Sequence, residues 1–370
     1  MKSWFLNRAS FLLLFLSLFF VLSTLCGDDK AFAQADISAW SNERLFDRAL
    51  RSSEAADCPW ALRLYRELLS RAVPARLDVR ARYNSALCFS RLGLDDEAVV
   101  AYERVAEEAP RSVAARNALY QLALLREHRG ELKAARRALD ELSRHFPRLS
   151  PVFERAVLVE MAWLDLRQRH GRRAARKLNR VFGQWKRMSE AEKRGERYVQ
   201  GKAHLAAGLL LSRRAYRVME KSLLFHRPLA QRARPWLESS AGHYAFARRQ
   251  KEALWAAAAD YAWGVNDLRL GQFIMKVTAP RHLSPGARRI FVERRREEAL
   301  KAWKRAAFHF LRGHEYAVGQ GVGGDWSRAL RDVALRIREK GIEALEKTDP
   351  PPLPWGDMSG GRLPDDAWEP

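Results

Sequence analysis

Cysteine is scarce in this chain. Only three of the 370 residues are cysteines, at positions 26, 58 and 88, too few for the set of several disulfides that holds small secreted domains together. A chain of this length must therefore draw its stability from an apolar core. Cys58 and Cys88 leave two interpretations open: they form one disulfide, or they are buried thiols that behave as small apolar residues.

Long apolar runs are also few. The main one extends from Phe11 to Leu25 and is shorter than the roughly twenty residues that a membrane-spanning helix needs. Basic residues precede it and the small residues of 31–35 follow it, an order typical of a secretory signal peptide. We therefore expect residues 1–33 to be removed and the mature chain to lie in the periplasm. The alternative is a lipoprotein cut before Cys26, although Leu25 stands where such sites have Gly or Ala.

Acidic residues are fewer than basic residues. The chain has 44 Asp and Glu against 66 Lys and Arg, a formal net charge of +22, which creates a field that attracts anions. No compact basic motif with interleaved aromatics indicates a nucleic-acid fold, and export would remove that partner. Anionic lipid head groups, wall polymer or acidic proteins of the envelope remain as candidates. The alternative is that arginines simply cover solvated helix faces, as in RRRE at 294–297.

Patterns that would indicate an enzyme are incomplete. The string Gly319-x-Gly321-x-x-Gly324 matches the dinucleotide-binding fingerprint, but a helix pattern precedes it and no strand pattern occurs in the chain. His309 and His314 are five residues apart, which places them on different sides of a helix and argues against a metal site.

A wall-cleaving activity is a remote alternative. The segment LESSAGHYA at 237–245 is similar to the Glu-Ser start of the lytic transglycosylase motif, but the Gly-Leu-Met-Gln segment that should follow Glu238 is missing. No Ser/His/Asp or Cys/His arrangement follows from spacing. We therefore expect no enzymatic activity, no cofactor and no metal.

A repeat is the strongest positive feature. Ala61, Ala98 and Ala135 are separated by 37 residues, and each is followed by an aromatic or Leu one turn later and by a closing Pro. Gly93 and Gly130 precede the second and third Ala, whereas Ala56 stands at this place in the first copy. A fixed period of this size indicates stacked helical hairpins, because a single hairpin cannot bury its own apolar face.

These residues resemble the tetratricopeptide repeat family. The resemblance is strong over 79–148, fair over 42–74 and weak over 151–186, where Gly171 stands before a shortened turn and no Pro closes the copy. It implies an all-α fold, a right-handed α-solenoid of helical hairpins with a helical C-terminal extension. It also implies a scaffold that binds a peptide or protein along the concave surface formed by the first helix of each hairpin.

The family's pattern, carried over position by position, gives a peptide-binding groove. Its predicted lining is Phe46, Asp47, Leu50, Tyr83, Asn84, Leu87, Arg91, Tyr120, Gln121, Leu124 and His128. Phe46, Tyr83 and Tyr120 would form a ladder of rings, although packing between helices is the alternative for the two tyrosines. The family's carboxylate-clamp variety needs Lys or Arg where Glu43 and Asp47 stand, so capture of a chain-terminal carboxylate is not expected.

The second half predicts further helices. Ser189 and Glu192 form a capping-box pattern, and helical spacing continues to about residue 347. We divide the mature chain into three repeats (42–148), a degenerate repeat with linking helices (151–223), a C-terminal helical region (224–347), and a Pro/Gly-rich tail (348–370) that we expect to be disordered. The order of the C-terminal motifs looks like that of secreted tetratricopeptide proteins of gliding-motility and envelope complexes in proteobacteria.

The sequence thus predicts a periplasmic adaptor without enzymatic activity that binds a protein or peptide of a cell-envelope complex. The alternative is a cationic binder of an anionic envelope surface, either wall polymer or lipid head groups. The salt dependence of binding distinguishes these two functions, because binding to a charged surface weakens as ionic strength rises, while binding in an apolar groove persists.

Overall fold

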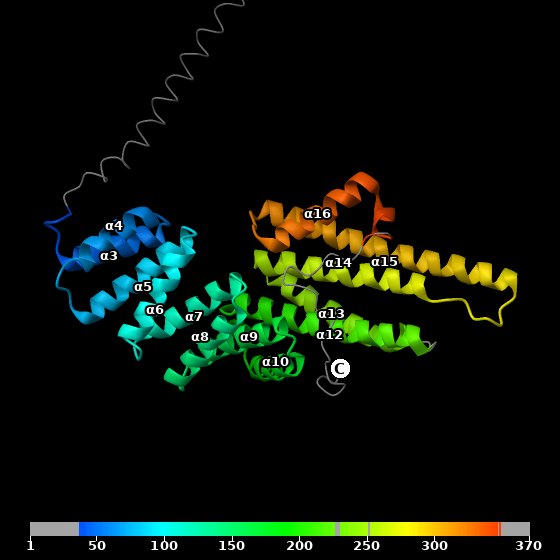
Figure 1. Ribbon diagram of the computed structural model, residues 1–370, viewed down its shortest axis with the longest axis horizontal. Coiled ribbons are helices and arrows are strands. Elements are labelled where there is room, and N and C mark those ends of the chain that lie inside the picture. The colour runs from blue at the N-terminus through cyan, green and yellow to red at the C-terminus, as the bar shows by residue number, and fades with distance from the viewer. Residues whose placement is uncertain (1–36, 226–229, 251, 347, 349–370) are drawn as a thin grey trace, which may run out of the picture. The chain divides into compact units, whose positions relative to one another are not determined.

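The chain is helical throughout the part that the structure describes. The computed structural model describes residues 37–225, 230–250, 252–346 and 348 (Figure 1). Within these ranges it has fourteen α-helices, one short 3-10 helix and no strand. The all-α prediction is confirmed, as is the packing of consecutive helices in pairs. The expected signal peptide and almost all of the tail lie outside the described residues.

The chain divides into two compact units, and the boundary after Ala118 falls within a helix. The described part of the first unit contains the helices α3 (Asn42–Glu54), α4 (Cys58–Leu69), α5 (Ala75–Arg91), α6 (Asp95–Glu108) and the start of α7 (Val113–His128). In this unit α3 pairs with α4 and α5 pairs with α6, and α5 also packs on both α3 and α4.

The second unit is described separately. After the end of α7 it contains α8 (Leu132–His145), α9 (Pro151–Arg167), α10 (Gly171–Trp185), α11 (Glu190–Arg194), α12 (Arg197–Phe225), α13 (Ala230–Arg249), α14 (Ala253–Lys276), α15 (Pro285–Gly319), α16 (Asp325–Lys340) and the 3-10 helix η1 (Ile342–Leu345). Here α9 pairs with α10, α12 packs on both, and the later helices follow as neighbours. None of the described helices has the length and apolar character needed to cross a membrane.

The turn inside each of the first four hairpins uses one residue with a positive φ. Gly93 (φ 72°) and Gly130 (φ 78°) occupy this place in two hairpins, and Ala56 (φ 63°) and Arg169 (φ 65°) occupy it in two others. This left-handed backbone conformation costs an L-residue about 1–2 kcal/mol. Ala56 and Arg169 therefore keep the turn geometry although their residue types do not favour it. The fourth turn is therefore not shortened: Arg169 takes the place that we assigned to Gly171, which instead begins α10.

Small residues allow the two helices of a hairpin to approach. Ala61, Ala98, Ala135 and Ala174 each stand five residues after the turn residue, and all are fully buried. The residue four positions later, in every copy Tyr or Leu, is also buried. Four hairpins thus share one packing scheme, because the period of the sequence returns the same side chains to the same places.

Caps fix several helix starts. The side chains of Ser41, Asp57, Ser150 and Ser284 accept hydrogen bonds from backbone N–H groups in the first turns of α3, α4, α9 and α15. The capping box of Ser189 and Glu192 is formed as predicted, although it begins only the five-residue helix α11. These contacts satisfy N–H groups that have no partner within their own helix.

The hairpin of α14 and α15 depends on close approach of the two helices, which run side by side in Figure 1. A Cβ atom at Gly264 would lie 2.8 Å from the Phe310 ring, and one at Gly271 would lie 2.4 Å from the Trp303 Nε1. Only glycine fits beneath these rings, because real Cβ atoms do not come so near to ring atoms.

The second unit also buries charged groups. Lys202 on α12 is 1% exposed, and its ammonium lies 5.3 Å from the ring centroids of both Trp163 and Trp255. It donates a hydrogen bond to the carboxylate of Glu160, and Glu127 lies 4.0 Å away. Burial opposes the charged form, but these carboxylates outweigh it and raise the pKa of Lys202 above its usual value.

Candidate functional site

The first unit has a groove formed by α3, α5 and the segment from the end of α6 to the start of α7. Its volume is about 720 Å³, within the range typical of ligand pockets. The lining residues are Leu50 from α3, Ala75, Arg76, Val79, Arg80, Tyr83 and Asn84 from α5, and Ala109, Ser112, Val113, Ala114 and Asn117. These are mainly apolar and amide side chains, a composition that suits a segment of polypeptide.

Tyr83 is the aromatic side chain of this groove. It is half-buried, and its ring tilts against Tyr102 with the ring centroids 6.1 Å apart. Burial raises the pKa of the Tyr83 hydroxyl, although Arg116 and Arg91 oppose the shift. The hydroxyl is therefore a neutral hydrogen-bonding group, and the ring is held in place by its neighbour.

The groove carries positive charge. Arg76 and Arg80 are exposed on α5, and no Asp or Glu is among the described residues of the lining. The guanidinium carbon of Arg80 lies 4.6 Å from the centroid of the Phe46 ring, a cation–π contact that restrains this side chain. The groove thus combines an aromatic side chain with two cations.

The comparison with protein families agrees with this geometry. The profile of the tetratricopeptide repeat family matches residues 80–112 and 117–148. The chain carries tetratricopeptide repeats. Among solved structures, a tetratricopeptide repeat protein from Parabacteroides merdae ATCC 43184 is similar, with a TM-score of 0.45 and 13% identity, over 80% of this chain and 97% of that chain. The comparison with curated proteins gave no match.

Three predicted residues meet in the groove of the repeats. Leu50, Tyr83 and Asn84 line it together, which makes them the part of the predicted set that a ligand could touch at once. Asp47 is exposed and Leu87 is half-buried, but neither is part of the lining. Arg91 is exposed and donates hydrogen bonds to the Ser53 carbonyl and hydroxyl, so its guanidinium links α5 to α3.

The prediction for Phe46 is wrong. Its side chain is only 3% exposed and packs edge-on against Tyr65 on α4, with the ring centroids 6.1 Å apart. Arg80 from α5 lies over the same ring. Phe46 therefore belongs to the core of the first hairpin, and the ladder of three ligand-facing rings does not include it.

The remaining predicted residues belong to the second unit. The ring of Tyr120 tilts against Phe153 on α9, with the centroids 5.3 Å apart. Burial raises the pKa of Tyr120 well above its usual value, and the carboxylate of Glu160 adds to the shift. Gln121 and Leu124 are half-buried and His128 is exposed. Tyr120 is thus held by its own unit, and its part in ligand binding stays a prediction.

The sequence interpretation missed Val79, Arg80 and Asn117. Val79 and Arg80 precede Tyr83 by four and three residues on α5, so helical spacing places all three on one face. That spacing was available in the sequence. Asn117 could not be found in this way, because its position depends on how the start of α7 meets α5 across the groove.

The two described cysteines lie together in the core of the first unit. Both are free thiols and buried, and their side chains are within hydrogen-bonding reach of each other. The Cys88 thiol also donates to the Ser53 hydroxyl at 3.4 Å. Burial, as the largest cause, raises the pKa of the Cys88 thiol to about 11, so at neutral pH it stays protonated and reacts slowly.

We expect oxidation of the native chain to join Cys58 and Cys88 without unfolding it, because both thiols are buried in the same core cluster and interact with each other. The bond would close a loop of about thirty residues and raise the free energy of unfolding by about 2–4 kcal/mol. Mass spectrometry of the non-reduced protein identifies the bond, and denaturant titrations of oxidised and reduced samples measure its effect. A Cys88→Ser variant should show no difference between the two samples; equal stability of the oxidised and reduced native chain would contradict the prediction.

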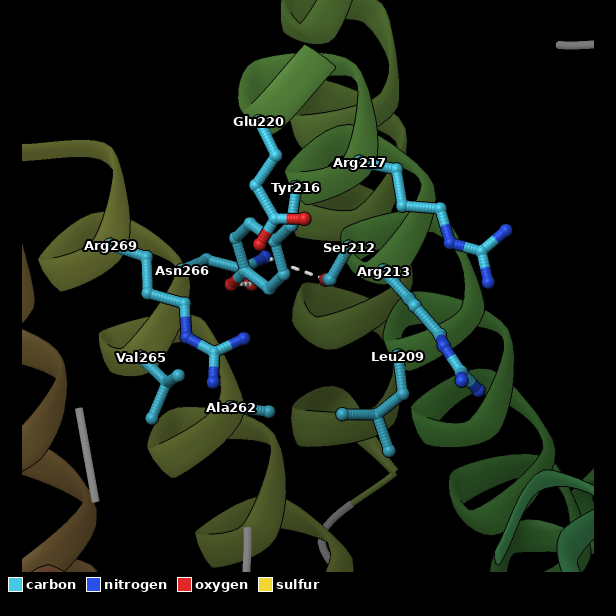
Figure 2. A pocket seen from close by; sticks show the side chains of 10 residues that line it. All are labelled: Leu209, Ser212, Arg213, Tyr216, Arg217, Glu220, Ala262, Val265, Asn266 and Arg269. Atoms are coloured by element: carbon cyan, nitrogen blue, oxygen red, sulfur yellow. Dashed lines mark hydrogen bonds between the residues drawn. The ribbon is translucent and has the colours of Figure 1, made fainter. Parts of the chain in front are cut away.

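A second cavity lies between α12 and α14 in the second unit (Figure 2). Asn266 on α14 donates hydrogen bonds to the hydroxyls of Ser212 at 2.8 Å and Ser240 at 3.0 Å, and it accepts one from Tyr216. Figure 2 shows Arg269 directed toward this network. The space is about 30 Å³, enough for one or two water molecules and too small for a peptide.

The weak enzyme patterns gain no geometric support. The segment of Gly319, Gly321 and Gly324 joins the end of α15 to the start of α16, so it lacks the strand that a dinucleotide site needs. Glu238 is exposed on α13 and pairs with Arg234. Within the described residues, no group of three or more His, Cys, Asp or Glu side chains could hold a metal ion.

Proposed function

We propose that the groove of the first unit binds an extended, acidic segment of a partner protein, and that the chain acts as a scaffold without enzymatic activity. Tetratricopeptide repeats generally serve protein–protein interaction. The single observation that supports a preference for acidic segments is the composition of the groove lining. It places the half-exposed Tyr83 ring beside Arg76 and Arg80, with no acidic side chain among its described members.

Each part of the groove has a role in this proposal. Tyr83 covers an apolar side chain of the partner, which contributes affinity through burial. The amides of Asn84 and Asn117 pair with the partner's backbone, since an amide can both donate and accept. Arg76 and Arg80 pair with carboxylates, which speeds association and selects acidic partners.

We further propose that this scaffold works in the bacterial cell envelope, within a multiprotein complex of the periplasm. The support is the order of basic residues, apolar run and small residues in 1–35, together with the likeness of the C-terminal motif order to secreted tetratricopeptide proteins. N-terminal sequencing of the chain purified from its own cells tests this point. A mature N-terminus at Gln34 or Asp36 is expected, and an uncut chain would overturn the envelope proposal.

Selection from a displayed library of random peptides against the chain tests the groove. We expect enriched peptides to combine acidic residues with one large apolar residue. For a synthetic peptide of this kind, Tyr83→Ala should raise the dissociation constant about 5- to 150-fold, since anchor residues contribute about 1–3 kcal/mol. Arg80→Glu should weaken binding most at low salt, because its contribution is electrostatic.

Val100→Ala is the matched control. Val100 is 64% exposed on α6 and lines a different hollow of the same unit, so its truncation should leave peptide binding unchanged. Enrichment of basic or purely apolar peptides would overturn the acidic preference. Binding that survives Tyr83→Ala in a folded chain would overturn the groove itself.

A further inference from the structure

Helix α15 has one face that packs and one that does not. Along its second half, Ala299, Ala302, Trp303, Ala306 and Phe310 are buried, and α14 is the main neighbour of the helix. The start of the helix, from Pro285 to Glu298, has no fully buried side chain. A helix of 35 residues is about 52 Å long, so α15 presents a long exposed surface.

Large apolar side chains lie on that surface. Ile290 is 53% exposed, Leu300 is 37% exposed and Phe308 is 56% exposed. At about 100° per residue, Ile290 and Phe308 are five whole turns apart and point in the same direction, about 27 Å from each other along the axis. Scattered exposed apolar residues need no explanation, but Ile290 and Phe308 are aligned on one side of the helix, and Leu300 lies about 80° around the axis from their line.

Basic residues occupy the same side. Arg294, Lys301 and Lys304 lie within about 40° of the line through Ile290 and Phe308, and all three are exposed. No ion pair within the described residues involves any of the three, whereas Arg305 and Arg312 on the same helix pair with Asp267 and Asp260. Glu297 lies on this side as well. Over residues 288–305 the exposed side chains comprise seven Arg and Lys and three Glu, so the surface is positive overall.

We propose that this outward face of α15, defined by Ile290, Arg294, Leu300, Lys301, Lys304 and Phe308, docks on an anionic phospholipid surface. A helix that lies in a membrane interface needs apolar side chains that enter the acyl boundary and cations that meet the head groups. The face supplies both, because all six side chains lie within about 80° of the line through Ile290 and Phe308. If this face contacted only water, the exposed cations would be favourable, but three large apolar side chains exposed among them would not.

The charge complements an anionic leaflet specifically. Each Lys or Arg near such a surface contributes about 1 kcal/mol, and the attraction decays within a Debye length. Binding therefore requires anionic lipid and low or moderate salt, while the apolar side chains hold the helix at the surface. The groove lies in the other unit and uses none of these residues, so the two activities are separable.

Vesicle co-sedimentation of the full chain tests the proposal. We expect binding to vesicles of phosphatidylcholine with phosphatidylglycerol, no binding to phosphatidylcholine alone, and release at about 1 M salt. The double variant Lys301→Glu/Lys304→Glu should reduce the partition coefficient at least about tenfold. Phe308→Ser should also reduce it, without changing the net charge.

The control separates this face from the general positive charge of the chain. Lys133→Glu/Lys186→Glu makes the same change of charge at two exposed positions elsewhere in the second unit and should leave partitioning within about twofold of the original, because charges beyond a Debye length from the surface contribute little. An equal loss in both double variants would overturn the assignment to α15. So would equal binding to both vesicle types, no binding to either, or binding only to an acidic protein. Melting curves establish that each variant is folded, and Tyr83→Ala should leave partitioning unchanged.

Discussion

Replacing Lys202 with methionine is expected to lower the free energy of unfolding by about 3–5 kcal/mol, the range for removing one partner of a buried ion pair. Lys202 is 1% exposed, so no water takes its place beside the carboxylate of Glu160. The variant would leave this carboxylate buried with its negative charge uncompensated. It would also remove the cation that lies between the rings of Trp163 and Trp255. Denaturant titration of the second unit's transition measures the change.

Two further variants make this experiment decisive. Lys133→Met changes an exposed lysine on α8 and should alter stability by less than about 0.5 kcal/mol. Glu160→Met combined with Lys202→Met removes both charges, and we expect it to recover much of the loss, because apolar residues often replace a buried pair without cost. If Lys202→Met were as mild as Lys133→Met, the buried pair would not have the role described.

Truncation of Phe46 to alanine is expected to cost about 3–5 kcal/mol of stability, because the ring fills the space between Tyr65 and Arg80 in the core of the first hairpin. The side chain is 3% exposed, so little of it could contact a ligand. Thermal or denaturant unfolding measures the loss, and the same peptide used for the groove measures binding under conditions where the variant is folded.

Phe46 and Tyr83 occupy equivalent places in the sequence repeat but should behave oppositely. Tyr83→Ala should weaken peptide binding with a smaller loss of stability, since its ring is half-exposed in the groove. Phe46→Ala should lower stability and leave the affinity of the folded fraction nearly unchanged. A binding defect in Phe46→Ala larger than that of Tyr83→Ala would contradict the assignment of the two rings.

The periodic features of this protein were determined by its sequence. The 37-residue spacing of Ala61, Ala98 and Ala135 gave helical hairpins, and it placed Gly93 and Gly130 in their turns. This works because hairpin packing is local: each small residue meets a partner helix that is joined to its own by a short turn. The same locality allowed the Ser189 capping box to be identified.

Residues whose surroundings come from other helices were decided only by the tertiary structure. Phe46 and Tyr83 have the same register, yet one ring is covered by Arg80 and the other lines a groove. The turn at Arg169 departs from the sequence pattern, because the positive φ between the packed helices α9 and α10 falls on a residue that does not favour it. Local patterns set which helices form. The exposure of each side chain depends on contacts between distant segments, and no periodicity encodes those contacts.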